Sequence, residues 1–458
     1  MSFKGYLDKL KGKRVFVLGA GISNCPLIEA LLLAGIDTTV CDRRSRDELG
    51  AQAGRFERLG AVLRLGEGYL DNLNADVIFR TPGIMPWRHS IAEAVKNGAV
   101  LTSEMEAFFE VCPCIKIGVT GSDGKTTTTS FIAQLLKNEG LRVHVGGNIG
   151  NPLLCTADDM AANDVAVLEL SSFQLISMKE SPEIAIVTNL SPNHLDVHKD
   201  MDEYIAAKRN IFSWQTKSDV AVFNLDYDLT RKYSEQAPGE VRFFSRLCIA
   251  GNGVYTDGET IFDVHGTTKN EIMKVSEILL PGMHNVENIM AAFAALRGLV
   301  SYDIMRDTAR TFSGVAHRIE FVREIDGVKY YNDSIASSPT RTIAGLNAFD
   351  QKLILIAGGK DKGIEFDELG AEVLMHVKTL VLTGLTAQRI KSVVENTIGY
   401  AGTPEIIVRD DFRQAVLFAA QSACRGDIVM LSPACTSFDR FLNFEERGNY
   451  FKGIINGL

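Results

Sequence analysis

The chain alternates short apolar runs, rich in β-branched residues, with stretches of helical period from one end to the other. Several of the runs show no polar alternation, which is typical of strands covered on both faces. Eight runs are clear strand candidates: 14–19, 76–83, 114–121, 164–170, 183–190, 219–225, 352–359 and 427–434. Amphipathic segments such as 126–140 and 285–300 lie between them. Strands that alternate with helices predict βαβ units and mostly parallel sheets, so the expected fold class is α/β.

A different texture appears at about 241–280, where VRFF and NGVYTDGETIFDVHG resemble antiparallel hairpins. We therefore expect antiparallel strands to be added to the middle of the chain. Weak breaks before residue 114 and near 312–318 suggest three domains. The predicted domains are 1–108, 109–312 and 313–458, each of ordinary domain size.

Composition limits the class of protein and of partner. The 458 residues include 48 Lys and Arg against 57 Asp and Glu, for a net charge of −9, with the apolar and charged fractions of a globular protein. The acidic balance argues against broad binding to nucleic acid or to anionic membranes. It does not exclude small anions, because backbone amides and a few local cations bind phosphate whatever the total charge.

The cysteines and one apolar run bear on the compartment. The eight cysteines are scattered, and Cys112 and Cys114 are too close for a C-x-x-C motif, which indicates free thiols in a reducing environment. The run 15–36 resembles a signal peptide or short membrane span, but glycines, an asparagine and a proline divide it into strand, turn and helix. We therefore expect a cytoplasmic protein.

The sharpest local signal is IGVTGSDGKTTTT at 117–129, a strand that leads through a glycine turn into a helix. The N–H groups at such a helix start point at phosphate oxygens, Lys125 can reach the terminal phosphates, and the Thr126 hydroxyl can bind Mg²⁺. The spacing departs from G-x-x-x-x-G-K-[ST], because Val119 stands where the first glycine is expected. The alternative is a glycine turn with a chance lysine, but the strand–turn–helix setting favours a nucleoside triphosphate.

A second glycine turn, LGAGISN at 18–24, opens the first βα unit, and Asp42 follows about 20 residues on. This is nearly a dinucleotide fingerprint, but Asn24 stands where the third glycine belongs. A nucleotide-type ligand is favoured, NAD is weakly supported, and a structural turn remains the alternative. Asp42 with Arg43 and Arg44 could bind a ribose and a phosphate, or form a solvated charge cluster.

Three polar residues in the middle of the chain follow or accompany predicted strands. Glu169 closes one strand, His194 follows the next, and Lys208 lies on a helix. Because open α/β sheets bind ligands at the carboxyl ends of their strands, Glu169 and His194 should converge near the phosphate loop. A carboxylate there suits Mg²⁺ and phosphate chemistry. Taken singly, these residues could be a capped strand end, a loop histidine and a surface lysine.

Weaker motifs follow in the second half of the chain. Asn285 and Asn288 are three apart and share one helix face, and Arg318 is a candidate cation for a γ-phosphate. In order along the chain, TGSDGKTTT, NLSPNHLD, AAKRNIF, HNVEN, HRIE, NDSIASSP, GGKDKG and SPACTSFDRFLNFEERG resemble the Mur ligase family, the ATP-dependent amino-acid-adding enzymes of peptidoglycan precursor synthesis. The resemblance covers the whole chain. One departure is Ile335, where some members carry a lysine.

The resemblance implies a Rossmann-like N-terminal domain for a UDP-sugar, a central P-loop-type ATPase domain, and a Rossmann-like C-terminal domain for the incoming amino acid. Within the family, the chain resembles the branch that adds D-glutamate to UDP-N-acetylmuramoyl-L-alanine, because it has the C-terminal motif of that branch and lacks the DNPR motif of the branch that adds a diamino acid. Neither nucleic acid nor membrane is an expected partner, and a monomer is expected.

The resemblance also implies roles for individual residues. The catalytic residues would be Lys125, Glu169, His194 and Lys208. One Mg²⁺ would be held by Thr126 and Glu169, and a second by His194 and carbamoylated Lys208. ATP would contact Gly121, Ser122, Asp123, Gly124, Lys125, Thr126, Thr127, Asn285, Asn288, Arg318 and Asp333. The UDP-sugar would contact Gly21, Ile22, Ser23, Asp42, Arg43, Gly83 and Asn148. D-Glutamate would contact Ser337, Lys362, Ser437 and Phe444.

Three alternatives remain open at this point. The chain could add another amino acid or be a folylpolyglutamate-synthase-like ligase that shares the ATP loop. It could be an NAD-dependent oxidoreductase built on LGAGIS, which Asn24 disfavours. It could be a non-catalytic nucleotide sensor, which the joint presence of the four predicted catalytic residues disfavours.

Overall fold

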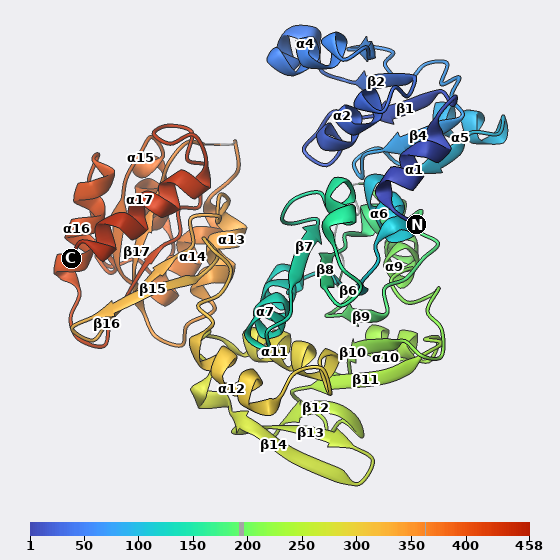
Figure 1. Ribbon diagram of the computed structural model, residues 1–458. Coiled ribbons are helices and arrows are strands. Elements are labelled where there is room, and N and C mark those ends of the chain that lie inside the picture. The colour runs from blue at the N-terminus through green and yellow to red at the C-terminus, as the bar shows by residue number, and fades with distance from the viewer. Residues whose placement is uncertain (192–196, 362) are drawn as a thin grey trace. The chain divides into compact units, whose positions relative to one another are not determined.

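The computed structural model describes residues 1–191, 197–361 and 363–458. They form two compact units. The first unit contains residues 1–276 and 287–308, and the second contains residues 277–286 and 309–458. The first unit holds two sheets and the second holds one (Figure 1). The predicted α/β class is confirmed, since most strand pairs in all three sheets are parallel.

The N-terminal sheet is entirely parallel and has helices between its strands. Its spatial order is β3 (Val62–Leu65), β2 (Thr38–Asp42), β1 (Val15–Leu18), β4 (Val77–Arg80) and β5 (Val100–Thr102). Its helices are α1 (Phe3–Leu10), α2 (Cys25–Leu33), α3 (Arg46–Leu49), α4 (Ala51–Arg58), α5 (His89–Lys96) and α6 (Glu104–Val111). This order matches five of the six strands of the Rossmann order 3-2-1-4-5-6, so the N-terminal sheet is Rossmann-like, as expected. The apolar run 15–36 is strand, turn and helix, as interpreted.

The central sheet has nine strands, and its parallel part carries the phosphate-loop candidate. Its order is β14 (Thr268–Lys274), β13 (Thr260–His265), β12 (Asn252–Thr256), β11 (Glu240–Ser245), β10 (Val220–Asn224), β9 (Ile184–Val187), β6 (Ile115–Thr120), β8 (Val165–Glu169) and β7 (Val143–Gly147). Its helices are α7 (Lys125–Asn138), η1 (Leu154–Asp159), α8 (Ser172–Leu175), α9 (Met201–Arg209), α10 (Asp228–Ser234), η2 (Val275–Glu277), α11 (Met283–Ala295) and α12 (Tyr302–Thr311).

The added strands are antiparallel only in part. Strands β12, β13 and β14 form antiparallel pairs, as predicted for this region. The interpretation of VRFF as part of a hairpin is wrong, because β11 pairs in parallel with both β10 and β12. The reason is that helix α10 separates β10 from β11 and carries the chain back across the sheet, which makes the two strands parallel.

The two sheets of the first unit share one hydrophobic core. A continuous buried cluster includes Phe3 and Val15 from the N-terminal part and Leu168 from β8. Hydrogen bonds also connect η1 with the N-terminal part. On η1, Asp158 Oδ1 accepts from the Phe3 amide of α1 at 2.6 Å, and the Leu154 amide donates to Glu104 of α6 at 2.9 Å. The N-terminal sheet is therefore packed onto the central one.

The C-terminal sheet is parallel except for one edge hairpin. Its order is β15 (Glu320–Ile325), β16 (Val328–Asn332), β20 (Ile428–Leu431), β17 (Leu353–Ala357), β18 (Val377–Leu382) and β19 (Glu405–Val408). Its helices are α13 (Pro339–Leu346), α14 (Asp367–His376), α15 (Ala387–Asn396), α16 (Phe412–Ser422) and α17 (Phe444–Asn456). All eight strands predicted from the apolar runs are present in the three sheets, each within its expected range.

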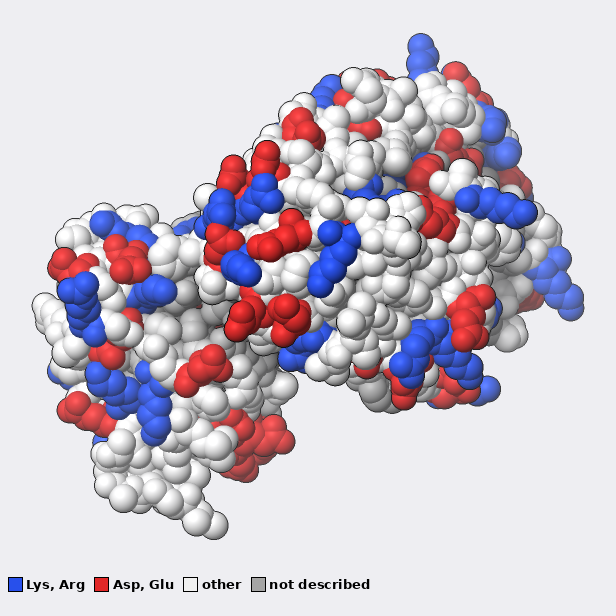
Figure 2. All heavy atoms as spheres, turned by 90° about the horizontal axis from the view of Figure 1, so that it is seen from below, with Lys and Arg blue, Asp and Glu red and all other residues white. Residues whose placement is uncertain are grey.

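The face drawn in Figure 2 agrees with the argument from net charge against broad binding to nucleic acid or anionic membranes. Basic and acidic side chains are interspersed there, and no continuous basic area is visible (Figure 2). Among the described residues, no helix combines the length and the apolar character needed to cross a membrane.

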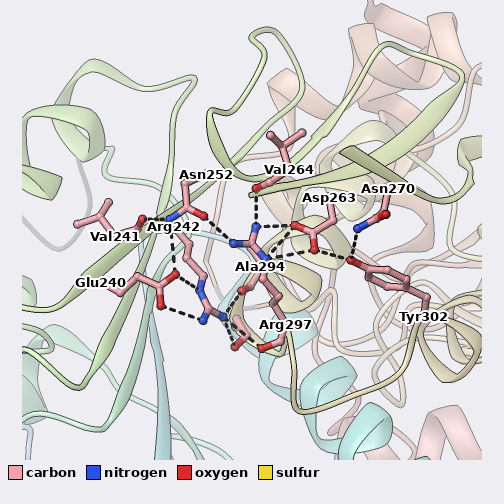
Figure 3. Close-up of polar contacts among 11 residues, drawn as sticks. Glu240, Val241, Arg242, Asn252, Asp263, Val264, Asn270, Ala294, Arg297 and Tyr302 are labelled. Carbon is pink, nitrogen blue, oxygen red and sulfur yellow. Dashed lines mark hydrogen bonds and ion pairs between the residues drawn. The ribbon is translucent and has the colours of Figure 1, made fainter. Parts of the chain in front are cut away.

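Two arginines tie strands β11 to β13 of the central sheet to helix α11 (Figure 3). Arg242 on β11 donates from Nη1 to the Ala294 carbonyl at 3.1 Å, at the C-terminal end of the helix, and from Nε to Glu240 at 2.8 Å. A guanidinium at this position satisfies terminal carbonyls and complements the partial negative charge of the helix end. The helix thereby gains a fixed C-terminus on the sheet.

The second arginine, Arg297, connects the end of α11 with the antiparallel strands (Figure 3). Its Nε donates to Asp263 Oδ1 at 2.9 Å and its Nη1 donates to Asn252 Oδ1 at 2.6 Å. The Tyr302 hydroxyl donates to the other Asp263 oxygen at 2.7 Å. Both charged side chains are largely buried, at 13% and 5% exposure.

Asp263→Ala should lower the free energy of unfolding by about 3–5 kcal/mol, because it leaves the Arg297 guanidinium buried without its counter-charge. Urea titration of the full chain measures this loss. The control is Asp303→Ala, since Asp303 pairs with Arg306 but is 83% exposed. There we expect a loss of at most about 1 kcal/mol. Equal losses in the two variants would contradict a structural role for the buried network.

Candidate active site

The phosphate-loop candidate follows β6 and leads into α7, as expected. Helix α7 begins at Lys125, and Gly124 before it has a left-handed backbone with φ of 79°. A Cβ on Gly124 would lie 2.2 Å from Oδ1 of Asn288 on α11, and a Cβ on Gly121 would lie 1.9 Å from the Thr188 hydroxyl after β9. The two glycines therefore let neighbouring segments approach the loop backbone closely.

Hydrogen bonds hold the loop in this shape. The Ser122 hydroxyl donates to the Ser191 carbonyl at 2.8 Å, and the Asp123 amide donates to Asn189 Oδ1 at 2.9 Å. The Lys125 ammonium folds back and donates to two loop carbonyls at 2.9 and 3.0 Å. A cation beside a helix N-terminus makes an arrangement that can bind phosphate. Thr126 is half-buried in the first helical turn, and Thr127 after it is buried.

Glu169 is the last residue of β8 and is almost completely buried. Its Oε1 accepts a hydrogen bond from Asn148 Nδ2 at 2.8 Å. Its Oε2 is buried and has no hydrogen-bond partner within 1–191, 197–361 and 363–458. A buried carboxylate oxygen without a partner is unfavourable, and such an oxygen suits a hard cation like Mg²⁺. Asn148, predicted to contact the UDP-sugar, lies against this carboxylate.

Lys208 on α9 is buried against the same loop, with 3% of its surface exposed. Its Nζ donates to the Gly121 carbonyl at 2.7 Å and to the Thr120 hydroxyl at 3.3 Å. Burial and the charge of Lys125 hold the pKa of Lys208 well below its usual value, although Glu169 opposes the shift. The interpretation of this residue as a plain surface lysine is therefore excluded. A neutral amine, unlike an ammonium, can react with carbon dioxide to form a carbamate.

Two predicted site residues, His194 and Lys362, lie outside the described residues. The nucleotide candidates on α11 divide between the units. Asn288 accepts from the Thr128 hydroxyl at 3.3 Å in the first unit. Asn285 belongs to the second unit and donates to the Pro281 carbonyl at 2.7 Å.

The N-terminal glycine turn is closed by a side chain rather than by a third glycine. Asn24 is buried, and its Nδ2 donates to the carbonyls of Leu18 at 3.3 Å and Gly19 at 2.9 Å. Gly19 has φ of 91°, and a Cβ there would lie 2.8 Å from Thr81 Cγ2. The turn is thus packed onto the segment after β4, and its Asn24 occupies the position at which a dinucleotide fold needs glycine.

The remaining UDP-sugar candidates lie around this turn. Both oxygens of Asp42 are used within the chain: Oδ2 accepts from the Ala20 amide and Oδ1 from the Arg44 amide and guanidinium. Burial opposes ionisation, but these hydrogen bonds outweigh it and hold the pKa of Asp42 at about 2. In contrast Gly21, Gly83, Arg43 and Ile22 are exposed, with Ser23 half-buried between them.

In the second unit, the predicted nucleotide residue Asp333 is buried at the end of β16. It accepts from the Ser432 hydroxyl at 2.7 Å and from the Ile319 amide at 3.2 Å. Burial outweighs these bonds and the charge of nearby Arg318, and raises the pKa of Asp333 to about 7. Ile335, the departure from the family pattern, donates its amide to the His317 carbonyl at 3.1 Å.

The amino-acid candidates lie in the loops around β16, β20 and α17. Ser437 is buried, Ser337 and Phe444 are half-buried, and the Phe444 ring packs edge-on against His317 at 5.9 Å. Sequence reasoning missed Arg447, which is 2% exposed.

Arg447 donates to the hydroxyl and carbonyl of Ser334 at 2.9 and 2.8 Å and to the Cys435 carbonyl at 3.1 Å. It joins the two loops that carry Asp333 and Ser437. The C-terminal motif FEERG contains this arginine, and it could have identified Arg447 as a site residue from the sequence.

Taken together, the first unit brings Lys125, Glu169 and Lys208 to the carboxyl ends of β6 and β8. The set contains a cation at a helix N-terminus, a buried carboxylate oxygen without a hydrogen-bond partner among the described residues, and a lysine amine with a lowered pKa. Such a set suits transfer of a phosphoryl group from a nucleotide.

Profiles of one enzyme family match two stretches of the chain. The Mur ligase middle domain matches residues 119–296, and the Mur ligase, glutamate ligase domain matches residues 317–435. Together they include the phosphate loop and most of the second unit.

Curated relatives are similar over the full length. UDP-N-acetylmuramoylalanine--D-glutamate ligase of Acetivibrio thermocellus is 50% identical over 457 residues, which covers 99% of this chain and 98% of that protein. The ligase of the same name from Clostridium novyi is 49% identical over 459 residues and covers 100% and 99%. The crystal structure of UDP-N-acetylmuramate-alanine ligase from Thermotoga maritima shares the fold, with a TM-score of 0.57 at 16% identity over 97% of this chain and 99% of that one.

Gly124→Ala should weaken binding of a non-hydrolysable ATP analogue about tenfold or more. A left-handed alanine costs about 1–2 kcal/mol, and its Cβ would displace Asn288 from the loop. Isothermal titration calorimetry measures the dissociation constant. Gly140→Ala is the control, because Gly140 follows the other end of α7 with φ of 91° but has open space around it. That variant should bind the analogue within about twofold of the parent chain, and parity between the two variants would refute the close-approach argument.

Proposed function

The chain belongs to the Mur ligase family, and we propose that it uses ATP to join D-glutamate to UDP-N-acetylmuramoyl-L-alanine during peptidoglycan precursor synthesis. The observation that carries this proposal is the identity of about 50% over the full chain to ligases of that name. The cluster of half-buried Lys125 with buried Glu169 and Lys208 at the phosphate loop supports an active enzyme rather than a nucleotide sensor.

Each part of the chain has a role in this proposal. Residues 1–108 bind the UDP-sugar, 109–312 bind ATP, and 313–458 bind D-glutamate. The boundary at 108 falls within α6, so the N-terminal and central parts are joined by a helix as well as by a shared core. The exposed rim of the glycine turn, including Ile22 and Arg43, supports the first assignment because a uracil and a phosphate need accessible apolar and basic surface.

The reaction activates a carboxylate and then forms an amide. The alanyl carboxylate of the UDP-sugar attacks the γ-phosphate of ATP, which gives ADP and an acyl phosphate. The amine of D-glutamate attacks the acyl carbonyl, and the tetrahedral intermediate expels phosphate. In this proposal Lys125 and the N-terminus of α7 bind phosphate oxygens and offset the charge that builds up on them.

The donor set near the loop fits magnesium. We propose that Thr126 and Glu169 hold one ion and that His194 and a carbamoylated Lys208 hold a second. The unpartnered Oε2 of Glu169 supports the first site, and the depressed pKa of Lys208 supports the carbamate. Bound Mg²⁺ would neutralise phosphate charge and align the reacting oxygens.

The second unit supplies the nucleophile's binding site in this proposal. Ser337, Lys362, Ser437 and Phe444 contact D-glutamate, while Arg318 and Asp333 with Asn285 contact the nucleotide. An acyl phosphate hydrolyses in water, so we expect the C-terminal domain to close over the reacting centre. We also propose a cytoplasmic location, because ATP and UDP-sugars are cytoplasmic substrates. We propose a monomer as well.

Substrate choice is tested by phosphate release from ATP in the presence of UDP-N-acetylmuramoyl-L-alanine and one amino acid at a time. We expect release with D-glutamate and little with L-glutamate, L-alanine or L-lysine. An arm with L-glutamate and folate tests the folylpolyglutamate-type alternative, and a titration with NAD tests the oxidoreductase. Release with L-glutamate and folate but not with D-glutamate would overturn the proposed function.

Lys208→Ala should lower kcat at least 100-fold, because it removes both the carbamate and its ion-binding oxygens. Acetate should restore part of the activity by placing a free carboxylate in the vacated space. Carbon-13 NMR after exposure to labelled bicarbonate should show a carbamate signal in the parent chain and none in the variant. Arg209→Ala, which changes the exposed neighbour on α9, is the control and should retain full turnover. Unchanged kcat in Lys208→Ala would remove this residue from the mechanism.

A further inference from the structure

Arg80 is the last residue of β4, and its side chain is completely buried. It lies directly before the segment of Thr81 and Gly83, which packs on the N-terminal glycine turn. A buried guanidinium is costly unless its N–H groups are paired with well-placed acceptors. The partners of Arg80 therefore indicate what the residue does.

The guanidinium bonds two segments that are distant in the sequence. From Nη1 it donates to the carbonyls of Pro82 at 3.4 Å and Ile84 at 3.3 Å, within its own turn. From Nη2 it donates to the Phe173 carbonyl and to the Ser177 hydroxyl, both at 2.8 Å. The shorter bonds are those to the second segment, which contains α8 and belongs to the central sheet.

Helix α8 is connected to the segments that carry two predicted metal ligands. It begins three residues after Glu169, and its Leu175 carbonyl accepts from Nδ2 of Asn210 at 3.0 Å. Asn210 caps α9, the helix that carries Lys208. The Ser172 hydroxyl is 2.9 Å from a ring nitrogen of buried His198. A shift of α8 would therefore be felt by both Glu169 and Lys208.

At the N-terminal end of this connection, the turn after Arg80 is bonded to the glycine turn. The Thr81 amide donates to the Leu18 carbonyl at 2.9 Å, and its methyl group occupies the space above Gly19. The turn held by Arg80 is thus fixed to the glycine turn at which the UDP-sugar is proposed to bind. One side chain connects that binding site to the helix beside the phosphate loop.

Stability alone does not account for a charge at this position. The Nε of Arg80 has no hydrogen-bond partner in the described part of the chain, and neither does Oε2 of nearby Glu106. Burial raises the pKa of Glu106 against a hydrogen bond from Ser103 and the charge of Arg80. An apolar side chain at position 80 would avoid the unpaired Nε. What it could not provide is directed bonding to two separate segments.

We propose that Arg80 is a positioning residue that fixes the UDP-sugar site of the N-terminal sheet on helix α8, so that the acceptor carboxylate meets the γ-phosphate in one constant geometry. This inference rests on the proposed function. Misplacement of a reacting group by about 1 Å can cost about 100-fold in rate, so the loss of one such connection should be measurable.

The test compares Arg80→Met and Arg80→Lys with the parent chain. For Arg80→Met we expect the KM for UDP-N-acetylmuramoyl-L-alanine to rise about tenfold and kcat to fall about 10- to 100-fold. The KM for ATP and the affinity for an ATP analogue should stay within about twofold. Phosphate released should exceed amide formed, because a misplaced acyl phosphate is lost to water. Arg80→Lys keeps the charge, so its kcat should be higher than that of Arg80→Met. It should stay below the parental kcat, because one ammonium cannot bond both segments at once.

Arg64→Met is the matched control. Arg64 lies on β3 of the same sheet, and within the described residues its Nη1 donates to the carbonyls of Asp71 and Asn72, both in the N-terminal part. It can lower the melting temperature but should leave both KM values and the ratio of phosphate to amide unchanged. A loss of the same size in Arg64→Met would show that Arg80 acts through the stability of the sheet, and would overturn the proposal.

Two further outcomes decide the inference. An Arg80→Met enzyme with parental kcat/KM for the UDP-substrate, or with equal changes in both KM values, contradicts it. If Arg80→Met does not fold, Ser177→Ala decides, since it removes the acceptor that follows α8 directly. A smaller rise in the same KM supports the proposal and parental kinetics refute it. Failure of the proposed function is distinguishable, because the parent chain would then show no D-glutamate-dependent phosphate release.

Discussion

The close approach of chain segments at the carboxyl end of β6 is the constraint on which the central sheet depends. Gly121 and Gly124 have no side chains, and Thr188 and Asn288 occupy the space that side chains would need. This crowding lets the Lys208 amine reach the Gly121 carbonyl and places Glu169 beside it. A looser loop here would leave Lys125, Glu169 and Lys208 in separate solvated positions, and the pKa of Lys208 would return to its usual value.

The strands were predictable because burial on both faces leaves a strong local pattern. Each of the eight apolar runs contains a strand, and the glycine turns follow two of them as expected. The parallel pairing of β11 was not predictable, since VRFF carries no mark of the crossover that precedes it. A hairpin strand and a parallel strand differ in connection rather than in composition, and the helix of that connection, α10, has only seven residues.

Within the candidate site, predictability follows the distance over which residues interact. Lys125 and Thr126 are visible because the strand, turn and helix that place them are adjacent in the sequence. Lys208 reads as a surface residue until the fold buries it, and only the resemblance to a family gave it a role. The contact of Asn148 with Glu169 and that of Arg80 with Phe173 join residues 21 and 93 positions apart. No local pattern marks such pairs, because either partner would be equally reasonable in another setting.

The proposed carbamate on buried Lys208 would depend on dissolved carbon dioxide. A carbamate on a neutral amine forms and dissociates with the carbon dioxide dissolved around the protein, without an assembly factor. The proposed second magnesium site would then be complete only while that gas is present. Occupancy of the proposed site would follow the concentration of dissolved carbon dioxide in the cell.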